Sequence, residues 1–201
     1  MDEAERLERL WAGDFGKRYA DRNAVLDGRR AAFWHDLVDR HGIRSVLEVG
    51  CGQGGNLAPL VQRLEPADVW GIDVNDVAIA RARINAPGAN IVRSRARLLP
   101  FRDGFVDLAF TMGVLIHQPE ESLATVIAEI ARCARSYVLW GEYHAPQTEA
   151  VPYHGETGAL FRRDYADIYR TLHPELSVVD EGFLDADSGF DRVTWQLLAR
   201  R

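Results

Sequence analysis

Side chains that can move a proton gather in two short stretches of the sequence. His117 follows one β-rich run, and Glu142, Tyr143 and His144 follow another. The carboxyl ends of parallel strands open onto one crevice, so we expect these side chains to face a common substrate site. A histidine or a carboxylate there can act as a general base, which makes His117, Glu142 and His144 the catalytic candidates. For His117, capping of the following helix is an equally simple role.

A glycine-rich segment, Glu48-Val49-Gly50-Cys51-Gly52-Gln53-Gly54-Gly55, joins a β-rich run to a predicted helix. Glycines allow a tight turn and let a ligand approach the backbone closely. The N-terminus of the helix behind them offers free N–H groups. Asp73 ends the next predicted strand, where a carboxylate can accept both hydroxyls of a ribose. Together these features predict a nucleotide-type ligand, and a turn with a purely structural role is the alternative.

The spacing of Gly50, Gly52 and Gly55 also fits the G-x-G-x-x-G pattern of dinucleotide sites. Three features favour S-adenosylmethionine (SAM) over NAD. Glu48 would repel a pyrophosphate but suits the cationic end of SAM. A chain of 201 residues leaves no room for a separate substrate domain. The last predicted elements are two strands and not a second mononucleotide-binding half. An NAD-linked oxidoreductase stays the less favoured reading.

The elements that must position these residues begin with an N-terminal helical cap, predicted over residues 1–41. In its first part, 3–23, apolar side chains spaced by three and four residues form one helical stripe. Gly13 and Gly16 weaken that helix and are expected to interrupt it. A second helix is predicted over 31–41.

The rest of the chain alternates between β-rich and helical segments, which predicts a parallel sheet with right-handed crossovers. The last two strands have no helix between them and are expected to be antiparallel. The predicted fold is a doubly wound, mainly parallel, seven-stranded α/β sheet with an antiparallel C-terminal hairpin, in a single domain over 1–201. The predicted strands cover 45–49, 69–73, 90–92, 105–111, 137–140, 176–183 and 192–199, and the helices cover 56–64, 76–84, 120–134 and 163–172.

Residues 145–160 include two prolines and two glycines and show no periodicity, which predicts an irregular lid or binding loop. With its flanks, 143–162, this segment is the predicted substrate loop. The candidate substrate-binding residues come from this loop and from the N-terminal stripe: Trp11, Tyr19, Arg22, Asn23, Tyr143, Tyr153 and Arg162.

Composition and charge exclude several classes of protein. With 47% hydrophobic and 27% charged residues, the chain is an ordinary globular domain. Its net charge of −6 argues against a nucleic-acid partner, and no apolar run is long enough to span a bilayer. Two cysteines, Cys51 and Cys133, and six histidines show no metal-ligand spacing, so no metal is expected. We expect a cytoplasmic monomer or homodimer with a small-molecule substrate.

Three segments together resemble the successive motifs of class I SAM-dependent methyltransferases: Val46 to Asn56, Gly71 to Asp73, and Leu99 to Leu108. The resemblance implies that SAM binds and that S-adenosylhomocysteine (SAH) is the product. It implies that Glu48 orients the amino group of SAM and that Asp73 holds the ribose. The cofactor residues on this reading are Glu48, Gly50, Gly52, Gly54, Asp73, Val74, Ala96 and Met112. After the third strand the family often has an acid that contacts adenine, but here the residues are Ser94-Arg95-Ala96.

A narrower resemblance covers nearly the whole chain. The segments Leu10 to Asn23, Thr111 to His117, Glu142 to His144, Val151 to Gly155 and Leu160 to Tyr165 are similar to methylases associated with pseudaminic acid biosynthesis. This family implies a sugar acceptor through its pathway. An N-methyltransferase for an amino or guanidino metabolite is the alternative, and a non-catalytic SAM-binding protein is the alternative from another class.

Overall fold

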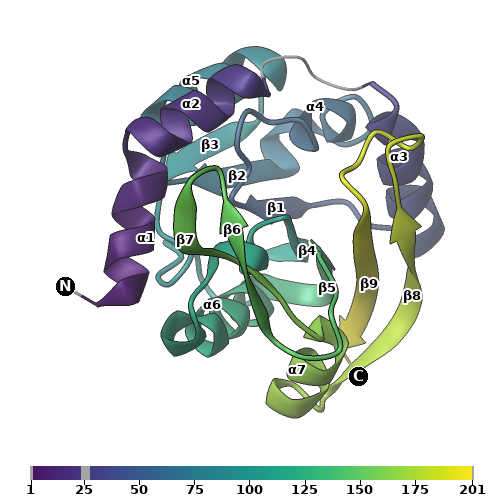
Figure 1. Cartoon of the computed structure of the whole chain (residues 1–201). Helices are drawn as coiled ribbons and strands as arrows, with labels where there is room; N and C mark the ends of the chain where they lie inside the picture. The colour runs from purple at the N-terminus through teal and green to yellow at the C-terminus, as the bar shows by residue number, and fades with distance from the viewer. Residues whose placement is uncertain (1, 24–27, 201) are drawn as a thin grey trace.

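The structure, a computed structural model, describes residues 2–23 and 28–200 of the chain. Helices pack on both faces of a central sheet, as Figure 1 shows. The helices are α1 (Glu3–Ala12), α2 (Asp14–Arg22), α3 (Arg30–His41), α4 (Leu57–Leu60), α5 (Asp76–Asn85), α6 (Glu120–Cys133) and α7 (Tyr165–Leu172), with short 3-10 turns η1 (Pro66–Asp68) and η2 (Leu115–His117).

Within these residues the strand order of the main sheet is β3-β2-β1-β4-β5-β9-β8. The first five of these strands are parallel neighbours, and β9 runs antiparallel to both β5 and β8. This arrangement confirms the predicted fold. The strands are β1 (Val46–Val49), β2 (Val69–Asp73), β3 (Asn90–Arg93), β4 (Val106–Met112), β5 (Ala134–Glu142), β6 (Glu149–Tyr153), β7 (Glu156–Arg162), β8 (Leu176–Leu184) and β9 (Val193–Arg200).

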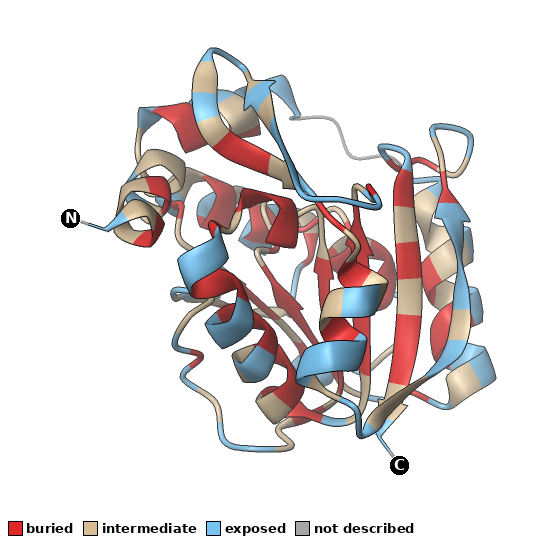
Figure 2. Cartoon of the chain, turned by 60° about the horizontal axis from the view of Figure 1, so that its bottom comes forward, coloured by how far each residue is buried: buried red, intermediate tan, exposed pale blue. Residues whose placement is uncertain are grey.

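Two apolar clusters fix the layers. On one face of the sheet, Trp34 and Leu37 of α3 pack with residues of α4 and α5. On the other face, Ile127 and Ile130 of α6 pack with Tyr169 of α7. All four residues of β1 are buried, which is typical of a central parallel strand covered on both sides. Figure 2 shows the inner strands buried and the outer sides of the helices exposed. The ends of the central strands are therefore held rigidly.

The N-terminal stripe is broken at Gly13, as expected, into α1 and α2. Close packing at this corner also requires Gly16, because a Cβ there would lie 1.8 Å from the carbonyl oxygen of Trp11. The Asn75 side chain donates to the same Trp11 carbonyl at 2.8 Å, which ties the corner to the start of α5. The predicted cap is thus docked next to the second strand, and residues 24–27 of it lie outside the described part of the chain.

The segment 145–160 is not irregular as expected, because it forms an antiparallel β-hairpin of β6 and β7. His154 and Gly155 both have positive φ, 48° and 89°, which is the backbone of a tight hairpin turn. Val151 and Tyr153 pack against the apolar cluster of α6 and α7. Pro152 is tolerated because a two-stranded hairpin has open edges.

The helix predicted over 56–64 is also shorter in the structure. Only Leu57–Leu60 is α-helical, and hydrogen-bonded turns continue to Leu64. Among the described residues, no helix is both long and apolar enough to cross a membrane.

Candidate functional site

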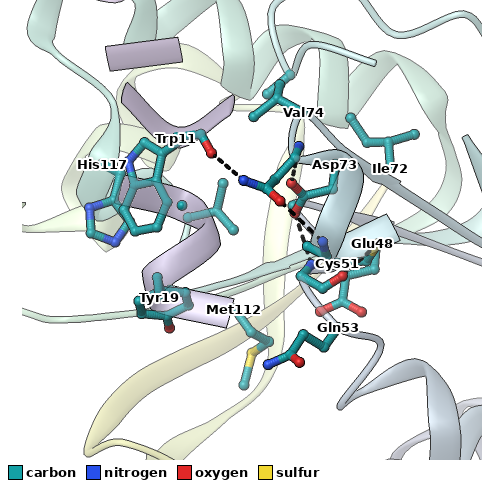
Figure 3. Close-up of a pocket in the computed structure, with 18 of the residues that line it drawn as sticks. Trp11, Tyr19, Glu48, Cys51, Gln53, Ile72, Asp73, Val74, Met112 and His117 are labelled. Carbon is teal, nitrogen blue, oxygen red and sulfur yellow. Dashed lines mark hydrogen bonds between the residues drawn. The ribbon is translucent and has the colours of Figure 1, made fainter. Parts of the chain in front are cut away.

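A cavity of about 290 Å³ lies beyond the carboxyl ends of β1, β2 and β4, between the sheet and α1–α2. Open α/β sheets bind ligands at this place, where the strand order reverses. Figure 3 shows Glu48, Cys51 and Asp73 on one side of it and Trp11, Tyr19 and His117 on the other. The predicted site residues that line it are Trp11, Tyr19, Asn23, Glu48, Gly50, Gly52, Asp73, Val74, Ala96, Met112 and His117.

Three of the glycines in the loop after β1 are each required for a different structural reason. Gly50, Gly52 and Gly54 all have positive φ, between 52° and 79°. A Cβ on Gly50 would lie 2.6 Å from Val114, and a Cβ on Gly54 would lie 3.2 Å from Ala82 of α5. Gly52 has open space beside it and lines the cavity, so a ligand can approach its backbone. Gly54, predicted to contact the cofactor, instead packs against a helix and does not line the cavity.

Asp73 closes the loop from the end of β2. Its Oδ2 accepts the Gly52 N–H at 2.9 Å, and its Oδ1 accepts the Asn75 N–H at 2.8 Å. Burial raises the pKa of Asp73, and these backbone hydrogen bonds lower it again. The carboxylate therefore bridges the glycine loop and the start of α5. Its remaining lone pairs face the cavity, where a pair of ribose hydroxyls can donate to them.

Glu48 is the buried carboxylate at the floor of the cavity. Its Oε1 accepts the side-chain amide of Asn56 at 2.6 Å, while its Oε2 is buried without a hydrogen-bond partner. Burial raises the pKa of Glu48 to about 8, although Asn56 and the charge of Arg30 act in the opposite direction. A cationic ligand would satisfy the free oxygen and favour the ionised form. No sequence pattern indicates a role for Asn56 or Arg30 at this site, because their role depends on contacts with Glu48.

The other side of the cavity has an aromatic wall, which we define as Trp11, Tyr19 and His117. The Trp11 ring lies 4.4 Å from the His117 ring and 5.2 Å from the Tyr19 ring, centroid to centroid. His117 Nδ1 donates to the carbonyl of Ala159 in β7 at 2.6 Å. Burial lowers the pKa of His117 to about 4, so the ring is neutral near pH 7. With Nδ1 protonated, Nε2 is the nitrogen that can accept a proton.

Glu142 does not reach the cavity. Its buried carboxylate accepts three backbone N–H groups, from Val114, Leu115 and Ile116, at 3.1–3.2 Å. Burial raises the pKa of Glu142 to about 7, and the same N–H groups lower it. The geometry is that of an anchor for the turn η2, which carries His117. The catalytic expectation for Glu142 therefore has no support in its position.

The remaining predicted residues surround the cavity without lining it. His144 and Arg162 are exposed at the base of the hairpin, and Arg22 is exposed over the Tyr19 ring, 5.9 Å from its centroid. Tyr153 packs on the wall, 5.2 Å from the His117 ring. Tyr143 donates its hydroxyl to Asp191, in the turn between β8 and β9.

Two residues that the sequence reading did not select hold the site together. Burial raises the pKa of Tyr19, Tyr143 and Tyr153, and the charge of Asp191 acts in the same direction on all three. Arg163 is 1% exposed and donates to the carbonyls of Leu115 and Gln118, on both sides of His117. Two consecutive arginines in a sequence do not indicate which of them is buried.

Comparisons with known proteins agree with this geometry. Residues 46–136 match the family model described as a methyltransferase domain. A phthiotriol/phenolphthiotriol dimycocerosates methyltransferase of Mycobacterium ulcerans is 35% identical over 101 residues, which is 48% of this chain and 36% of that relative. An uncharacterized methyltransferase of Synechocystis is 35% identical over 89 residues, 44% of this chain and 41% of the relative. This chain matches the methyltransferase-domain model, and each of these relatives, over less than half of its own length. It spans less than half the length of either relative.

Solved structures extend the similarity in fold to the whole chain, whose sheet matches that of class I methyltransferases. A 1,6-didemethyltoxoflavin-N1-methyltransferase of Burkholderia thailandensis, crystallised with its substrate and SAH, has a TM-score of 0.76 at 16% identity. The match covers 91% of that chain and 100% of this one. A magnesium protoporphyrin IX methyltransferase of Synechocystis, with bound SAH, has a TM-score of 0.75 at 17% identity and covers 98% of this chain and 100% of its own. The predicted cofactor is thus the ligand of proteins that share this fold.

Proposed function

We propose that the protein transfers the methyl group of SAM to a small-molecule acceptor, a sugar or another biosynthetic intermediate, and releases SAH. The observation that carries this proposal is the continuity of the cavity. Its glycine loop, Asp73 and Glu48 suit the ribose and the cationic end of SAM, and the same cavity ends at the aromatic wall. A SAM sulfonium bound across the loop would point its methyl group toward that wall.

Positioning supplies most of the rate in such a transfer. Two reactants held in line gain about 7–11 kcal/mol over the same encounter in water. In this chain the wall is fixed from three directions: Asn75 holds the α1–α2 corner, Ala159 holds the His117 ring, and Arg163 holds η2. The helices α1 and α2 and the hairpin would exclude water from the reaction.

We assign the role of general base to His117. Its Nε2 accepts a hydrogen bond from the acceptor hydroxyl or amine and takes the proton as the methyl–oxygen or methyl–nitrogen bond forms. Met112 and Tyr19 border the same part of the cavity. Glu142 acts indirectly, because its three hydrogen bonds fix the turn that carries His117. His144 and Arg162 are assigned no step.

One observation favours an amine acceptor as the second candidate. Tyr143 and Asp191 form a hydrogen-bonded pair beside Tyr153, at the edge of the wall. An ammonium group there would meet a carboxylate and several aromatic rings, which attract cations. The acceptor must then lose its proton before it attacks, and His117 would take it.

Mass spectrometry tests the proposal. The protein is incubated with SAM and separate pools of nucleotide-activated sugars and of amino metabolites, and SAH is measured with any product that gains one methylene unit. Product in the sugar pool supports the first candidate, and product in the amine pool replaces it with the second. SAM binding with no SAH above a boiled control in any pool would leave the non-catalytic binding protein as the better account.

A further inference from the structure

The cavity continues past Asp73 toward the ends of β2 and β3. Val74, which follows β2, and Ser94 and Ala96, which follow β3, line that end together with Glu8 of α1. A nucleotide whose ribose is held by Asp73 and whose other end lies at the glycine loop must place its base here. The base would pack on Val74 and meet Glu8 across the cavity.

Only one of the two carboxylate oxygens of Glu8 accepts a hydrogen bond. Its Oε1 accepts the guanidinium of Arg97 at 2.8 Å. Its Oε2 is buried and accepts no hydrogen bond, and its ion pair with Arg95 Nε is long, at 3.4 Å. The Glu8 side chain is only 16% exposed. A buried carboxylate oxygen that accepts no hydrogen bond destabilises the fold unless a donor from a ligand reaches it.

The chemistry of the adenine edge fits that oxygen. The exocyclic amine of adenine is a donor, so it needs an acceptor in the wall. The side chains of Arg95 and Arg97, which follow β3, carry donors only. We propose that Glu8 binds the exocyclic amine of the adenine of SAM, and that Arg97 holds the carboxylate in place for it. This assignment rests on the proposed use of SAM.

The position of Glu8 also links the two halves of the cavity. Trp11 is three residues further along α1, so both side chains lie on the same helical face, and both line the cavity. A cofactor that binds Glu8 fixes α1 against the sheet and thereby fixes the aromatic wall. Adenine recognition and the shape of the acceptor site are then properties of one helix.

The experiment compares two ligands in two proteins. Binding of SAH, and of the SAH analogue whose purine lacks the 6-amino group, is measured by isothermal titration for the wild type and for Glu8→Ala. The wild type is expected to prefer SAH by about tenfold to a hundredfold, the range for a hydrogen bond to a charged group. In Glu8→Ala the two ligands should bind with nearly equal affinity. The ratio is taken within each protein, so a general weakening of the fold does not produce this result.

Matched variants separate the possible failures. Glu5→Ala removes a carboxylate from the outer part of the same helix, where Glu5 pairs with Arg9, and should keep the wild-type ratio. Glu8→Gln retains an acceptor oxygen and should keep part of the ratio. Failure of the wild type to bind SAH at all overturns the proposed function. SAH binding with an unchanged ratio in Glu8→Ala overturns only the assignment of Glu8.

Discussion

The two sides of the cavity are assembled in different ways. On the cofactor side, Glu48, Gly52 and Asp73 belong to consecutive strand ends, and the hydrogen bond from Gly52 to Asp73 joins residues 21 apart. On the acceptor side, His117 is held by Ala159, 42 residues away, and Tyr143 by Asp191, 48 residues away. The cofactor side therefore depends on local turns, whereas the acceptor side depends on the docking of distant segments. Substitutions on the two sides should differ in what they change.

The largest effect is expected on the cofactor side. Asp73→Ala removes the acceptor of two ribose hydroxyls and should weaken SAM binding by about 3–6 kcal/mol, at about 1.5–3 kcal/mol for each charged hydrogen bond. The measurement is the dissociation constant of SAM from titration calorimetry. Asp76→Ala is the control, because Asp76 is an exposed carboxylate three residues further on that pairs with Arg93. Equal SAM affinity in wild type and Asp73→Ala would remove the ribose assignment.

The second effect separates chemistry from binding on the acceptor side. His117→Ala should lower kcat by about 10²–10⁴-fold, the range for loss of a general base, and leave SAM affinity close to that of the wild type. Glu142→Ala should lower kcat and thermal stability together, because it frees three buried N–H groups. His144→Ala, at an exposed position, should change neither. If His117→Ala keeps near-normal turnover, catalysis rests on positioning alone.

The same difference explains which features of the fold and of the site could be predicted from the sequence. Alternating segments and glycine signals predicted the mainly parallel seven-stranded sheet and most of the residues that line the cofactor side of the cavity, because each of these depends on nearby residues. The hairpin of β6 and β7 was missed, because Val151 and Tyr153 pack against residues that are distant in the sequence, among them Trp11 and His117. Glu142 was assigned to the acceptor site, because a strand-end position does not show that its carboxylate turns back to η2. Asp191 and Arg163 had no local signal at all.

The third effect tests whether distant docking holds the acceptor side. Arg163→Met leaves the carbonyls of Leu115 and Gln118 without their donor and should cost about 1–3 kcal/mol of folding free energy, with relief of the buried charge offsetting part of the loss. Arg162→Met changes the exposed neighbour and should stay within about 0.5 kcal/mol. Urea denaturation of both variants gives the comparison. Equal stability of the pair would show that the buried arginine does not secure η2.

The smallest effect, at most about 1.4 kcal/mol for each pH unit, is the pH dependence that Glu48 contributes on the cofactor side. The pKa of Glu48 is raised to about 8 without ligand, mainly by burial, with Arg30 and Asp73 as the charged groups that act on it. The folded protein therefore holds a proton on Glu48 that the unfolded chain has lost above its ordinary pKa near 4.5. Its contribution to stability is lost as pH rises from about 4.5 to 8, and the slope for one proton is at most about 1.4 kcal/mol per pH unit.

The affinity for a cationic ligand changes with pH in the opposite direction to the stability. SAM favours the ionised carboxylate, so its binding near pH 7 should release up to one proton, and its affinity should rise toward pH 8 by less than tenfold per pH unit. Calorimetry in buffers of different ionisation enthalpy counts the released protons. Glu48→Gln should abolish the release, flatten the pH dependence of SAM affinity and reduce that of stability, whereas Glu65→Gln, at an exposed position, should change none of these. Proton release that persists in Glu48→Gln would transfer the effect to Asp73, the other carboxyl of this cavity whose pKa is raised by burial.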